Sequence, residues 1–217
     1  MPARARRSAR KSSPPGAGGG RDFVEVDTPP RIIGGRLRGR RLAYSGRRDT
    51  RPMKHRVREA IFNLVGPAIV GQQAIDLFAG TGALGLEALS RGAARATFLE
   101  RHFPTADVIR ENLATLDVAE QAEVVPANAF LWTRTIPLEK SPAWVAFCSP
   151  PYDFYLERAD EMRQLIERIM AAAPPESTLV VEADGRFDSS SLPSASTWDV
   201  RQYPPAVVAV WRSESQA

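Results

Sequence analysis

Cysteine and histidine are nearly absent from this sequence. Cys148 is the only cysteine among 217 residues, and His55 and His102 are the only histidines. One cysteine excludes an intrachain disulfide and is typical of a reducing compartment such as the cytoplasm, where we expect the protein to act. So few thiol and imidazole groups do not favour a zinc site. We therefore predict a protein without a bound metal.

Long hydrophobic runs are absent as well. No apolar stretch approaches the roughly 20 residues that a membrane-spanning helix requires, so we expect no membrane contact. The composition, with 43% hydrophobic and 25% charged residues, is that of an ordinary globular domain. A chain of this length can bury one full-sized core and carry a modest appendage. A monomer is the expected state.

Acidic residues are scarce in the first third of the chain. Residues 1–58 carry 17 Lys or Arg and only 4 Asp or Glu, whereas the rest of the chain carries 12 against 21. The net charge of +4 is therefore the sum of a basic N-terminal part and an acidic remainder of the chain. Such an asymmetry indicates a polyanionic partner, and we favour nucleic acid over a merely solvated run of charges.

The N-terminal 22 residues have no apolar periodicity that could offset the entropy of ordering them. They are rich in arginine and also contain Pro14-Pro15 and three consecutive glycines. An Arg- and Ser-rich start can mark an organelle transit peptide, but this one lacks the apolar face of an amphipathic presequence. We predict a disordered basic arm over residues 1–22.

Residues 23–66 are predicted to form a small N-terminal extension that contacts RNA. Its segment 31–45 mixes apolar residues with glycines and arginines and predicts a β-hairpin. Residues 53–65 have the spacing of an amphipathic helix, for which Asp49 or Thr50 can serve as the cap. The hairpin arginines left for solvent or phosphate are Arg31, Arg36, Arg38, Arg40 and Arg41.

Residues 67–217 alternate between short apolar runs and helical patterns. The pattern predicts a mostly parallel seven-stranded sheet with helices on both faces and a C-terminal antiparallel hairpin, which is an α/β Rossmann-like domain. The expected helices cover residues 81–92, 103–116 and about 156–173. The expected strands are residues 73–79, 95–100, 122–127, 143–149, 177–183, 197–203 and 206–212.

The clearest local motif is the run from Asp76 to Gly85, DLFAGTGALG, in which a strand enters a glycine turn that opens a helix. Gly80 and Gly82 let the backbone approach a ligand closely, as in the dinucleotide fingerprint. Asp76 would repel a pyrophosphate, but its carboxylate suits the ammonium of an amino-acid group, directly or through water. S-adenosylmethionine therefore fits this loop better than a dinucleotide does.

Two later strand ends add groups that suit a nucleoside. Glu100 ends the next predicted strand, where a carboxylate can accept hydrogen bonds from both ribose hydroxyls. NAD contains such a ribose too, so Glu100 does not choose between the two ligands. Asn128 and Phe130 follow the third predicted strand. Asn128 can hydrogen-bond an adenine edge, and Phe130 can pack against the ring.

The segment Ser149-Pro150-Pro151-Tyr152 follows the fourth predicted strand. Consecutive prolines stiffen the backbone and remove two N–H donors, which leaves the Pro150 carbonyl and the Ser149 hydroxyl as acceptors. Two acceptors can orient an aromatic amine and favour its charged transition state. Tyr152 can stack on a base that has left its own stack. With the glycine loop upstream, the segment indicates methyl transfer to a nucleobase amine without a metal or a covalent nucleophile.

These motifs together resemble the RsmD-type family, bacterial enzymes that methylate the N2 amine of a guanine in small-subunit (16S) ribosomal RNA. The resemblance covers most of residues 30–212 and is carried by RIIGGRLRGRRL, RPMKHRVREAIFNLVG, DLFAGTGALGLEALSRGA, FLE and SPPY. It implies a class I S-adenosylmethionine-dependent methyltransferase fold with a small N-terminal hairpin. It also implies that the RNA is presented within assembling small ribosomal subunits.

The resemblance assigns roles to individual positions of this sequence. The implied catalytic residues are Ser149, Pro150, Pro151 and Tyr152. The implied S-adenosylmethionine-binding residues are Asp76, Phe78, Gly80, Gly82, Glu100, Arg101, Asn128, Ala129 and Phe130. The residues expected to contact RNA are Arg36, Arg38, Arg40, Arg41, Thr50, Arg51, Arg56 and Asn63.

Ser149 and Asn128 stand where the family usually has aspartate. Serine is a shorter and weaker acceptor than a carboxylate, and SPPY also occurs in methyltransferases of cytosine N4. Two alternatives to guanine-N2 methylation are therefore methylation of another base amine and a catalytically weak RNA-binding or ribosome-assembly factor. A nicotinamide-dependent oxidoreductase would explain the glycines alone, but SPPY offers nothing to a hydride transfer.

Overall fold

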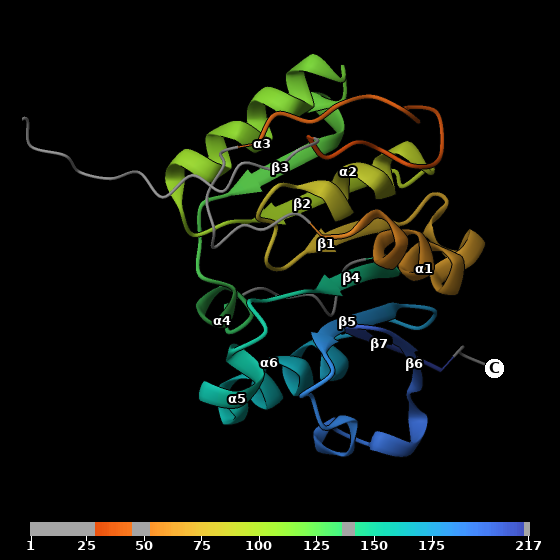
Figure 1. The fold of residues 1–217 in the computed structure, drawn as a ribbon, viewed down its shortest axis with the longest axis vertical. Coiled ribbons are helices and arrows are strands. Elements are labelled where there is room, and N and C mark those ends of the chain that lie inside the picture. The colour runs from red at the N-terminus through yellow and green to blue at the C-terminus, as the bar shows by residue number, and fades with distance from the viewer. Residues whose placement is uncertain (1–28, 45–52, 136–141, 215–217) are drawn as a thin grey trace, which may run out of the picture.

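The computed structural model describes residues 29–44, 53–135 and 142–214 (Figure 1). The predicted arm at 1–22 and the candidate RNA contacts Thr50 and Arg51 lie outside these ranges. Within the described ranges, no helix combines the length and the apolar character that crossing a membrane requires.

A seven-stranded sheet with the order β3-β2-β1-β4-β5-β7-β6 forms the centre of the molecule (Figure 1). The strands β1 to β5 run parallel, and β7 pairs antiparallel with both β5 and β6. This confirms the predicted parallel sheet with a C-terminal antiparallel hairpin. The strands are β1 (Gln73–Asp76), β2 (Arg95–Leu99), β3 (Ala122–Val125), β4 (Trp144–Cys148), β5 (Thr178–Asp184), β6 (Asp199–Tyr203) and β7 (Ala206–Arg212).

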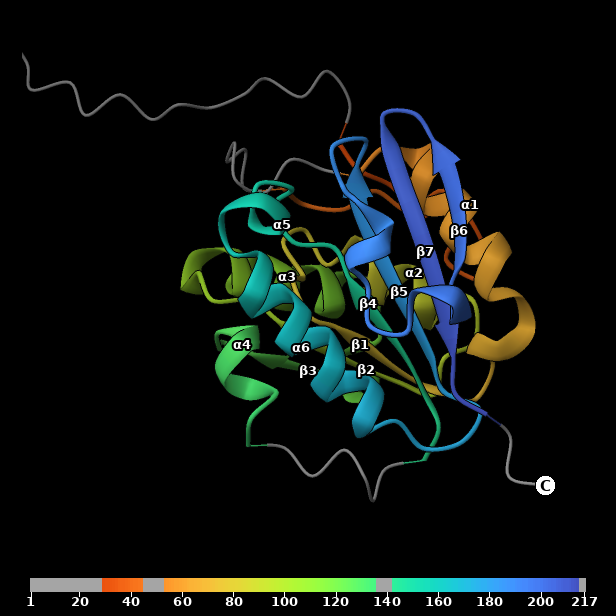
Figure 2. The ribbon, with the colours of Figure 1, turned by 90° about the horizontal axis from the view of Figure 1, so that it is seen from below.

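Helices cover both faces of this sheet (Figure 2). Because strand side chains alternate, Phe98 and Phe147 pack on one face, whereas Leu99 and Cys148 pack on the other. The first face is covered by α1 (His55–Val65), α2 (Ala83–Ser90) and α3 (Phe103–Thr115). The second is covered by α4 (Ala129–Trp132), α5 (Phe154–Glu157) and α6 (Ala159–Ala171).

Two predicted helix boundaries are wrong. The helix expected at about 156–173 is two helices, because Arg158 between α5 and α6 has φ −131° and ψ 33°, which no α-helix continues through. The helix expected over 53–65 begins at His55, and Lys54 is its N-cap without a side-chain cap. The predicted capping residues Asp49 and Thr50 lie outside the described residues.

The described part of the predicted hairpin, residues 31–44, has two short arms joined by an antiparallel bridge between Arg31 and Arg41. The Ile32 N–H donates to the Arg40 carbonyl, and the Leu42 N–H donates to the Pro30 carbonyl. The turn between the two arms is bonded to α2. The N–H of Arg36 donates to the Ser90 carbonyl at 2.8 Å, and that of Leu37 donates to the Ser90 hydroxyl at 2.9 Å. The loop is thereby fixed to the body of the molecule by its own turn.

The Glu87 carboxylate, fully buried in α2, ties this loop to two helices. It accepts from the Ile33 N–H at 2.9 Å and from Arg91 Nε at 2.8 Å, and it lies 3.5 Å from Nε of Arg58 in α1. Arg58 is itself 0% exposed, and its guanidinium donates to the Arg31 carbonyl. A buried arginine that loses its counter-charge is strongly destabilising.

We expect Glu87→Gln to lower the free energy of unfolding by about 3–5 kcal/mol, because it leaves Arg58 charged and buried without an anion. Urea denaturation measures this change. The matched control is Glu167→Gln, which breaks the exposed i,i+4 pair with Arg163 and should cost less than about 1 kcal/mol. Equal losses in the two variants would contradict the interpretation.

Candidate active site

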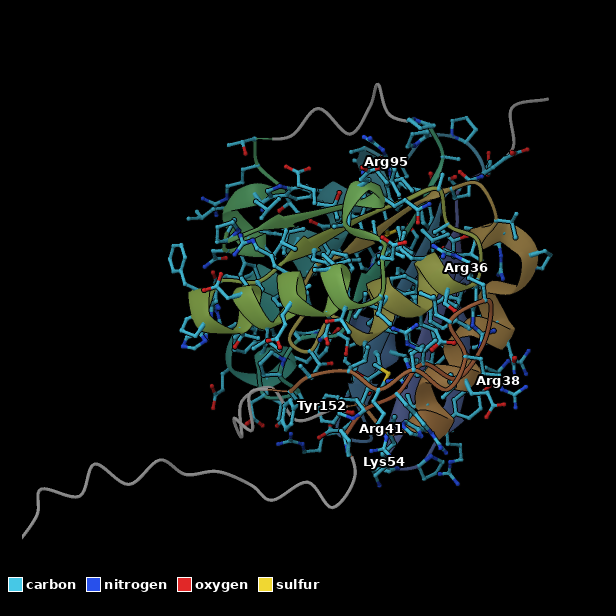
Figure 3. All side chains as sticks on the ribbon, turned by 90° about the horizontal axis from the view of Figure 1, so that it is seen from above. Arg36, Arg38, Arg41, Lys54, Arg95 and Tyr152 are labelled. Atoms are coloured by element: carbon cyan, nitrogen blue, oxygen red, sulfur yellow. The ribbon has the colours of Figure 1, made fainter. Side chains whose placement is uncertain are left out.

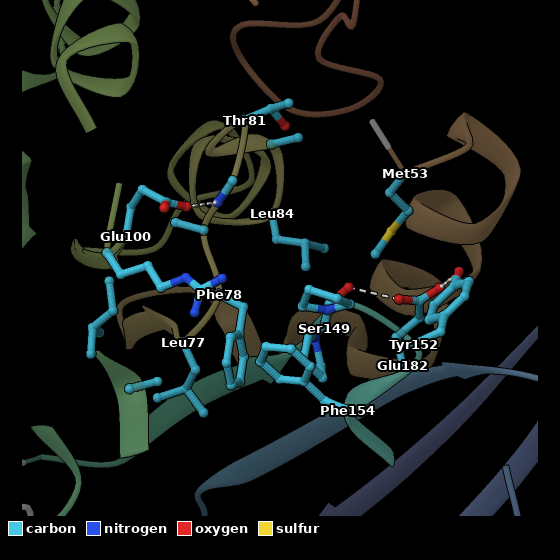
Figure 4. A pocket seen from close by; sticks show the side chains of 18 of the residues that line it. Met53, Leu77, Phe78, Thr81, Leu84, Glu100, Ser149, Tyr152, Phe154 and Glu182 are labelled. Carbon is cyan, nitrogen blue, oxygen red and sulfur yellow. Dashed lines mark hydrogen bonds between the residues drawn. The ribbon is translucent and has the colours of Figure 1, made fainter. Parts of the chain in front are cut away.

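A cavity of about 870 Å³ opens where the carboxyl ends of β1 to β5 meet (Figure 4). This volume lies within the range of roughly 300–1,000 Å³ that is usual for small-molecule sites. Parallel pairing produces this cavity, since each strand ends at the same edge of the sheet and is followed there by a loop. Ser149 to Tyr152 lie across the cavity from Glu100 in the close view (Figure 4).

The glycine loop between β1 and α2 follows the predicted geometry. Gly80 and Gly82 have φ of 51° and 74°, a left-handed conformation that favours glycine. The Gly82 N–H donates to the Ala79 carbonyl at 2.6 Å and closes the turn. Ala79, Gly80 and Thr81 line the cavity, whereas Gly82 does not. Gly82 therefore shapes the loop rather than forming the wall of the cavity.

Asp76 lies beneath this loop rather than on the cavity wall. Its Oδ2 accepts from the Gly85 N–H at 3.1 Å, and its side chain is buried, with 1% of the residue exposed. Its Oδ1 is buried and has no hydrogen-bond partner among the described residues. A buried, unpaired carboxylate oxygen fits a ligand that brings an ammonium group. From this position Asp76 would reach such a group through a water molecule.

Burial raises the pKa of Asp76 to about 7; the Gly85 N–H opposes this shift, and the charge of Glu100 adds to it. Gly85 leaves no room for a side chain, because a Cβ there would lie 2.3 Å from the Phe98 ring. The Asp76 hydrogen bond therefore holds the start of α2 against β1, and the close Gly85–Phe98 contact holds it against β2.

Glu100, at the end of β2, is held by the backbone on both of its oxygens. Oε2 accepts from the Gly80 N–H at 2.9 Å, and Oε1 accepts from the His102 N–H at 2.8 Å. The carboxylate lines the cavity. Because each carboxylate oxygen has a second lone pair, this fixed group can still accept two hydroxyl donors from a ribose.

Asn128 lines the cavity at the N-terminus of α4. Its Oδ1 accepts from the Phe130 N–H at 2.9 Å, and this cap fixes the orientation of the amide. The amide therefore offers a ligand its Nδ2 donor, besides the second lone pair of Oδ1. An aspartate, which the family usually has here, would offer an acceptor instead.

Three phenylalanine rings and two arginines form one part of the cavity wall. The rings of Phe78 and Phe130 lie 5.8 Å apart edge to face, and those of Phe130 and Phe154 lie 6.1 Å apart. The guanidinium of Arg158 lies 4.1 Å from the Phe130 ring centre. Arg101 also lines the cavity, with its guanidinium 6.0 Å from the Phe154 ring centre. Such a wall suits the flat face of a purine.

The Ser149 and Tyr152 hydroxyls converge on a carboxylate that sequence reasoning missed. Ser149 Oγ donates to Glu182 Oε2 at 2.6 Å, and the Tyr152 hydroxyl donates to Glu182 Oε1 (Figure 4). Pro150 and Pro151 lie between them in the chain and also line the cavity. All four predicted catalytic residues are therefore in one place, together with an acid from β5.

The residues expected to contact RNA are not all in one place. Arg38, Arg41 and Arg56 are exposed, and in Figure 3 Arg41 lies at the same edge of the view as Tyr152 and Lys54. Asn63 lies outside the cavity lining and borders a separate hollow beside Arg91.

Three of these arginines already have partners within the chain. Arg36 donates to the Gln121 side chain, Arg40 to the Thr115 carbonyl and Arg56 to the Pro204 carbonyl. All three bonds are at exposed positions, so contact with RNA would have to replace or share them.

Other cavity residues were not predicted from the sequence. Glu182 carried a usable signal, namely an acid near the end of an otherwise apolar strand. The rest are side chains without such a signal, and they include Met53, Lys54, Thr81, His102, Phe154, Arg158 and Pro205. Among the described residues, no cluster of three or more His, Cys, Asp or Glu could hold a metal ion.

The sheet order, the glycine loop and the cavity define a class I, Rossmann-like methyltransferase fold. The chain belongs to the family described as conserved hypothetical protein 95, the RsmD family, which matches residues 30–210.

Curated relatives carry ribosomal names. Ribosomal RNA small subunit methyltransferase D of Escherichia coli K12 is 45% identical over 122 residues, which is 56% of this chain and 60% of that protein. The Haemophilus influenzae protein of the same name is 40% identical over 127 residues, which is 58% of this chain and 65% of that protein. The matched part thus spans less than two thirds of each relative.

Solved structures agree over a larger part of the chain. The Escherichia coli protein YhhF is 32% identical with a TM-score of 0.68, covering 86% of this chain and 98% of that one. An RNA methyltransferase from Salinibacter ruber, solved with S-adenosyl-L-homocysteine, is 16% identical with a TM-score of 0.55, covering 76% and 95%. At that identity the likeness shows the fold alone.

The raised pKa of Asp76 predicts a pH-dependent stability. An acid with a pKa near 4 when unfolded and about 7 when folded makes the protein less stable as pH rises through this window. Between pH 5 and pH 8 this decline amounts to about 2.6 kcal/mol, which Asp76→Asn should remove. Urea denaturation at both pH values measures it, with Asp107→Asn as an exposed control. Parallel pH profiles for wild type and Asp76→Asn would contradict the prediction.

Proposed function

We propose that this protein transfers a methyl group from S-adenosylmethionine to the N2 amine of a guanine in small-subunit ribosomal RNA, in the cytoplasm. One observation carries the proposal. A single cavity contains both the glycine loop with Glu100 and the Ser149-to-Tyr152 segment. Binding groups for a nucleoside and acceptors for an amine thus lie within reach of one ligand.

The binding groups suggest how the cofactor lies. Glu100 accepts from the ribose hydroxyls, Asn128 donates to the adenine edge, and Phe130 packs against the adenine ring. Asp76 attracts the ammonium through water. S-adenosylmethionine supplies a methyl carbon on a sulfonium when it is bound. The residues of this chain only position the two reactants, and well-oriented proximity can lower a barrier by on the order of 7–11 kcal/mol.

The amine side of the reaction is assigned to the SPPY segment. The Pro150 carbonyl and Ser149 Oγ accept the N–H groups of the base amine, and Tyr152 stacks on the flipped base. Pro151, next to Pro150, keeps the turn rigid and without an N–H donor. Guanine N2 is the amine that the family resemblance favours. Methylation of another base amine is the alternative, because Ser149 replaces the usual aspartate.

RNA is proposed to approach over the N-terminal extension, residues 23–66, with residues 67–217 as the methyltransferase domain. Lys54 lines the cavity, and Arg38, Arg41 and Arg56 are exposed on the same extension. Basic side chains there would hold phosphates and thereby set the register of the base. We propose that the partner is an assembling small ribosomal subunit or its free RNA, bound by a monomer.

Methyl transfer tests the proposal directly. Tritium from labelled S-adenosylmethionine should enter unmethylated small-subunit RNA or particles, and mass spectrometry of the digested RNA should find N2-methylguanosine. Transfer to a different base amine would refute guanine N2 as the substrate but would support methyl transfer to a base amine. RNA binding without transfer to any RNA would favour the catalytically weak assembly factor and refute the enzyme.

Glu100→Ala should weaken binding of S-adenosylhomocysteine at least about tenfold, because hydrogen bonds to a charged group contribute about 1.5–3 kcal/mol each. Calorimetry without RNA measures the affinity. Glu100→Gln keeps one acceptor oxygen, so its affinity for S-adenosylhomocysteine should lie between those of wild type and Glu100→Ala. Glu123→Ala removes an exposed acid on β3 outside the cavity lining and should bind like wild type. Unchanged affinity in Glu100→Ala would remove Glu100 from the cofactor site.

A further inference from the structure

Glu182 occupies an unusual position for an acid. It lies in β5 between Val181 and Ala183, both buried, and is itself only 3% exposed. Cys148 at the end of β4 pairs with Val181, so the parallel register places Ser149 beside Glu182. The carboxylate lines the same cavity as the SPPY segment. Its location is therefore set by the sheet and not by a flexible loop.

Two hydroxyls satisfy this carboxylate, and both belong to the predicted catalytic segment. Ser149 Oγ donates to Oε2 at 2.6 Å, and the Tyr152 hydroxyl donates to Oε1. With its proton directed at Glu182, Ser149 Oγ can turn only lone pairs toward a ligand. A charged acceptor also strengthens the hydrogen bonds made through a hydroxyl. The pair Ser149–Glu182 thus presents an acceptor that is backed by a negative charge.

We propose that Glu182 supplies from β5 the negative charge that Ser149 does not bring to the amine pocket. The inference rests on the proposed methyl transfer and explains how a serine can stand where the family usually has aspartate. Glu182 acts through Ser149 and Tyr152 and is a positioning residue. Its carboxylate fixes both hydroxyls and accepts a proton by way of Ser149.

The proton transfer balances. The amine nitrogen forms a bond to the methyl carbon, whose bond to sulfur breaks, and the nitrogen becomes positively charged. One N–H proton then moves to Ser149 Oγ while the Ser149 hydroxyl proton moves to Glu182 Oε2. The products are a neutral methylated amine, a neutral thioether and a protonated Glu182, which returns its proton to solvent when the pocket opens.

The groups around Glu182 affect whether it is charged. Burial raises the pKa of Glu182, the hydroxyls of Ser149 and Tyr152 act against this shift, and the charge of Asp184 adds to it. The thiol of Cys148 and the phenol of Tyr155 lie 3.9 Å apart in the core on the sheet face that α5 and α6 cover, and burial raises the pKa of both. Neither carries charge at neutral pH, so neither supplies a negative charge to the amine pocket.

Moving the carboxylate from position 182 to position 149 tests the proposal. Glu182→Gln should lower kcat about 100-fold with KM for RNA nearly unchanged, a loss typical of removing a proton acceptor. Ser149→Asp alone puts two carboxylates side by side and should also lower kcat. The double variant Ser149→Asp/Glu182→Gln returns one carboxylate to the pocket and should recover to within about tenfold of wild type. Glu123→Gln, which changes an exposed acid on β3 outside the cavity lining, is the control and should retain wild-type kcat.

The outcomes separate the two proposals. If wild type transfers no methyl group to any RNA, the proposed function fails and the inference fails with it. If wild type is active and folded Glu182→Gln keeps its kcat, or if the double variant is no better than the single ones, only the role of Glu182 is refuted. Thermal melts identify a variant that has not folded.

A measurement without cofactor or RNA checks the contact itself. Carbon-13 NMR of carboxyl-labelled glutamate follows the titration of Glu182. Ser149→Ala and Tyr152→Phe each remove a donor to the carboxylate and should raise its pKa, while the exposed Glu123 stays unchanged as the internal control. This readout remains available if Glu182→Gln does not fold. A Glu182 pKa that neither variant moves would overturn the proposal.

Discussion

Parallel pairing of β1 to β5 is the constraint from which the candidate site follows. Parallel strands end at one edge, so the segments after β1, β2, β3 and β4 meet at one cavity although they are far apart in the sequence, and β5 adds Glu182. The sheet is closed on both faces by helices, which leaves this edge as the place where loops can shape a pocket.

Buried carboxylates recur at this edge, and each is held by donors from a neighbouring segment. Asp76 is bonded to the Gly85 N–H, Glu100 to the N–H groups of Gly80 and His102, and Glu182 to two side-chain hydroxyls. Charges in such positions are costly unless they are paired. Their presence therefore favours ligands that carry donors or positive charge, such as a ribose, an ammonium and a base amine.

The Ser149–Glu182 contact bears on why a methyltransferase-like site could lack its usual aspartate. Taken alone, serine at position 149 weakens the amine pocket and favours a catalytically weak factor. In the neighbouring strand β5, however, the Glu182 carboxylate accepts a hydrogen bond from Ser149 Oγ at 2.6 Å. Asn128 shows the same principle, because its cap on Phe130 N–H leaves a donor where the family usually has an acceptor. At both positions, the groups offered to a ligand depend on the hydrogen-bond partner of the side chain as much as on the residue type.

By itself, the sequence determined the α/β fold, the order of the seven strands along the chain, the glycine loop and the SPPY segment, because periodicity, turn residues and motifs are local. It did not determine the break at Arg158, the contact that fixes the N-terminal hairpin to α2, or the neighbour of Ser149. Those depend on contacts between distant segments: Ser90 with the N-terminal loop, and β4 with β5. Only the tertiary structure decides them, since hydrogen-bond partners across a sheet are set by register, and register is settled when the whole core packs.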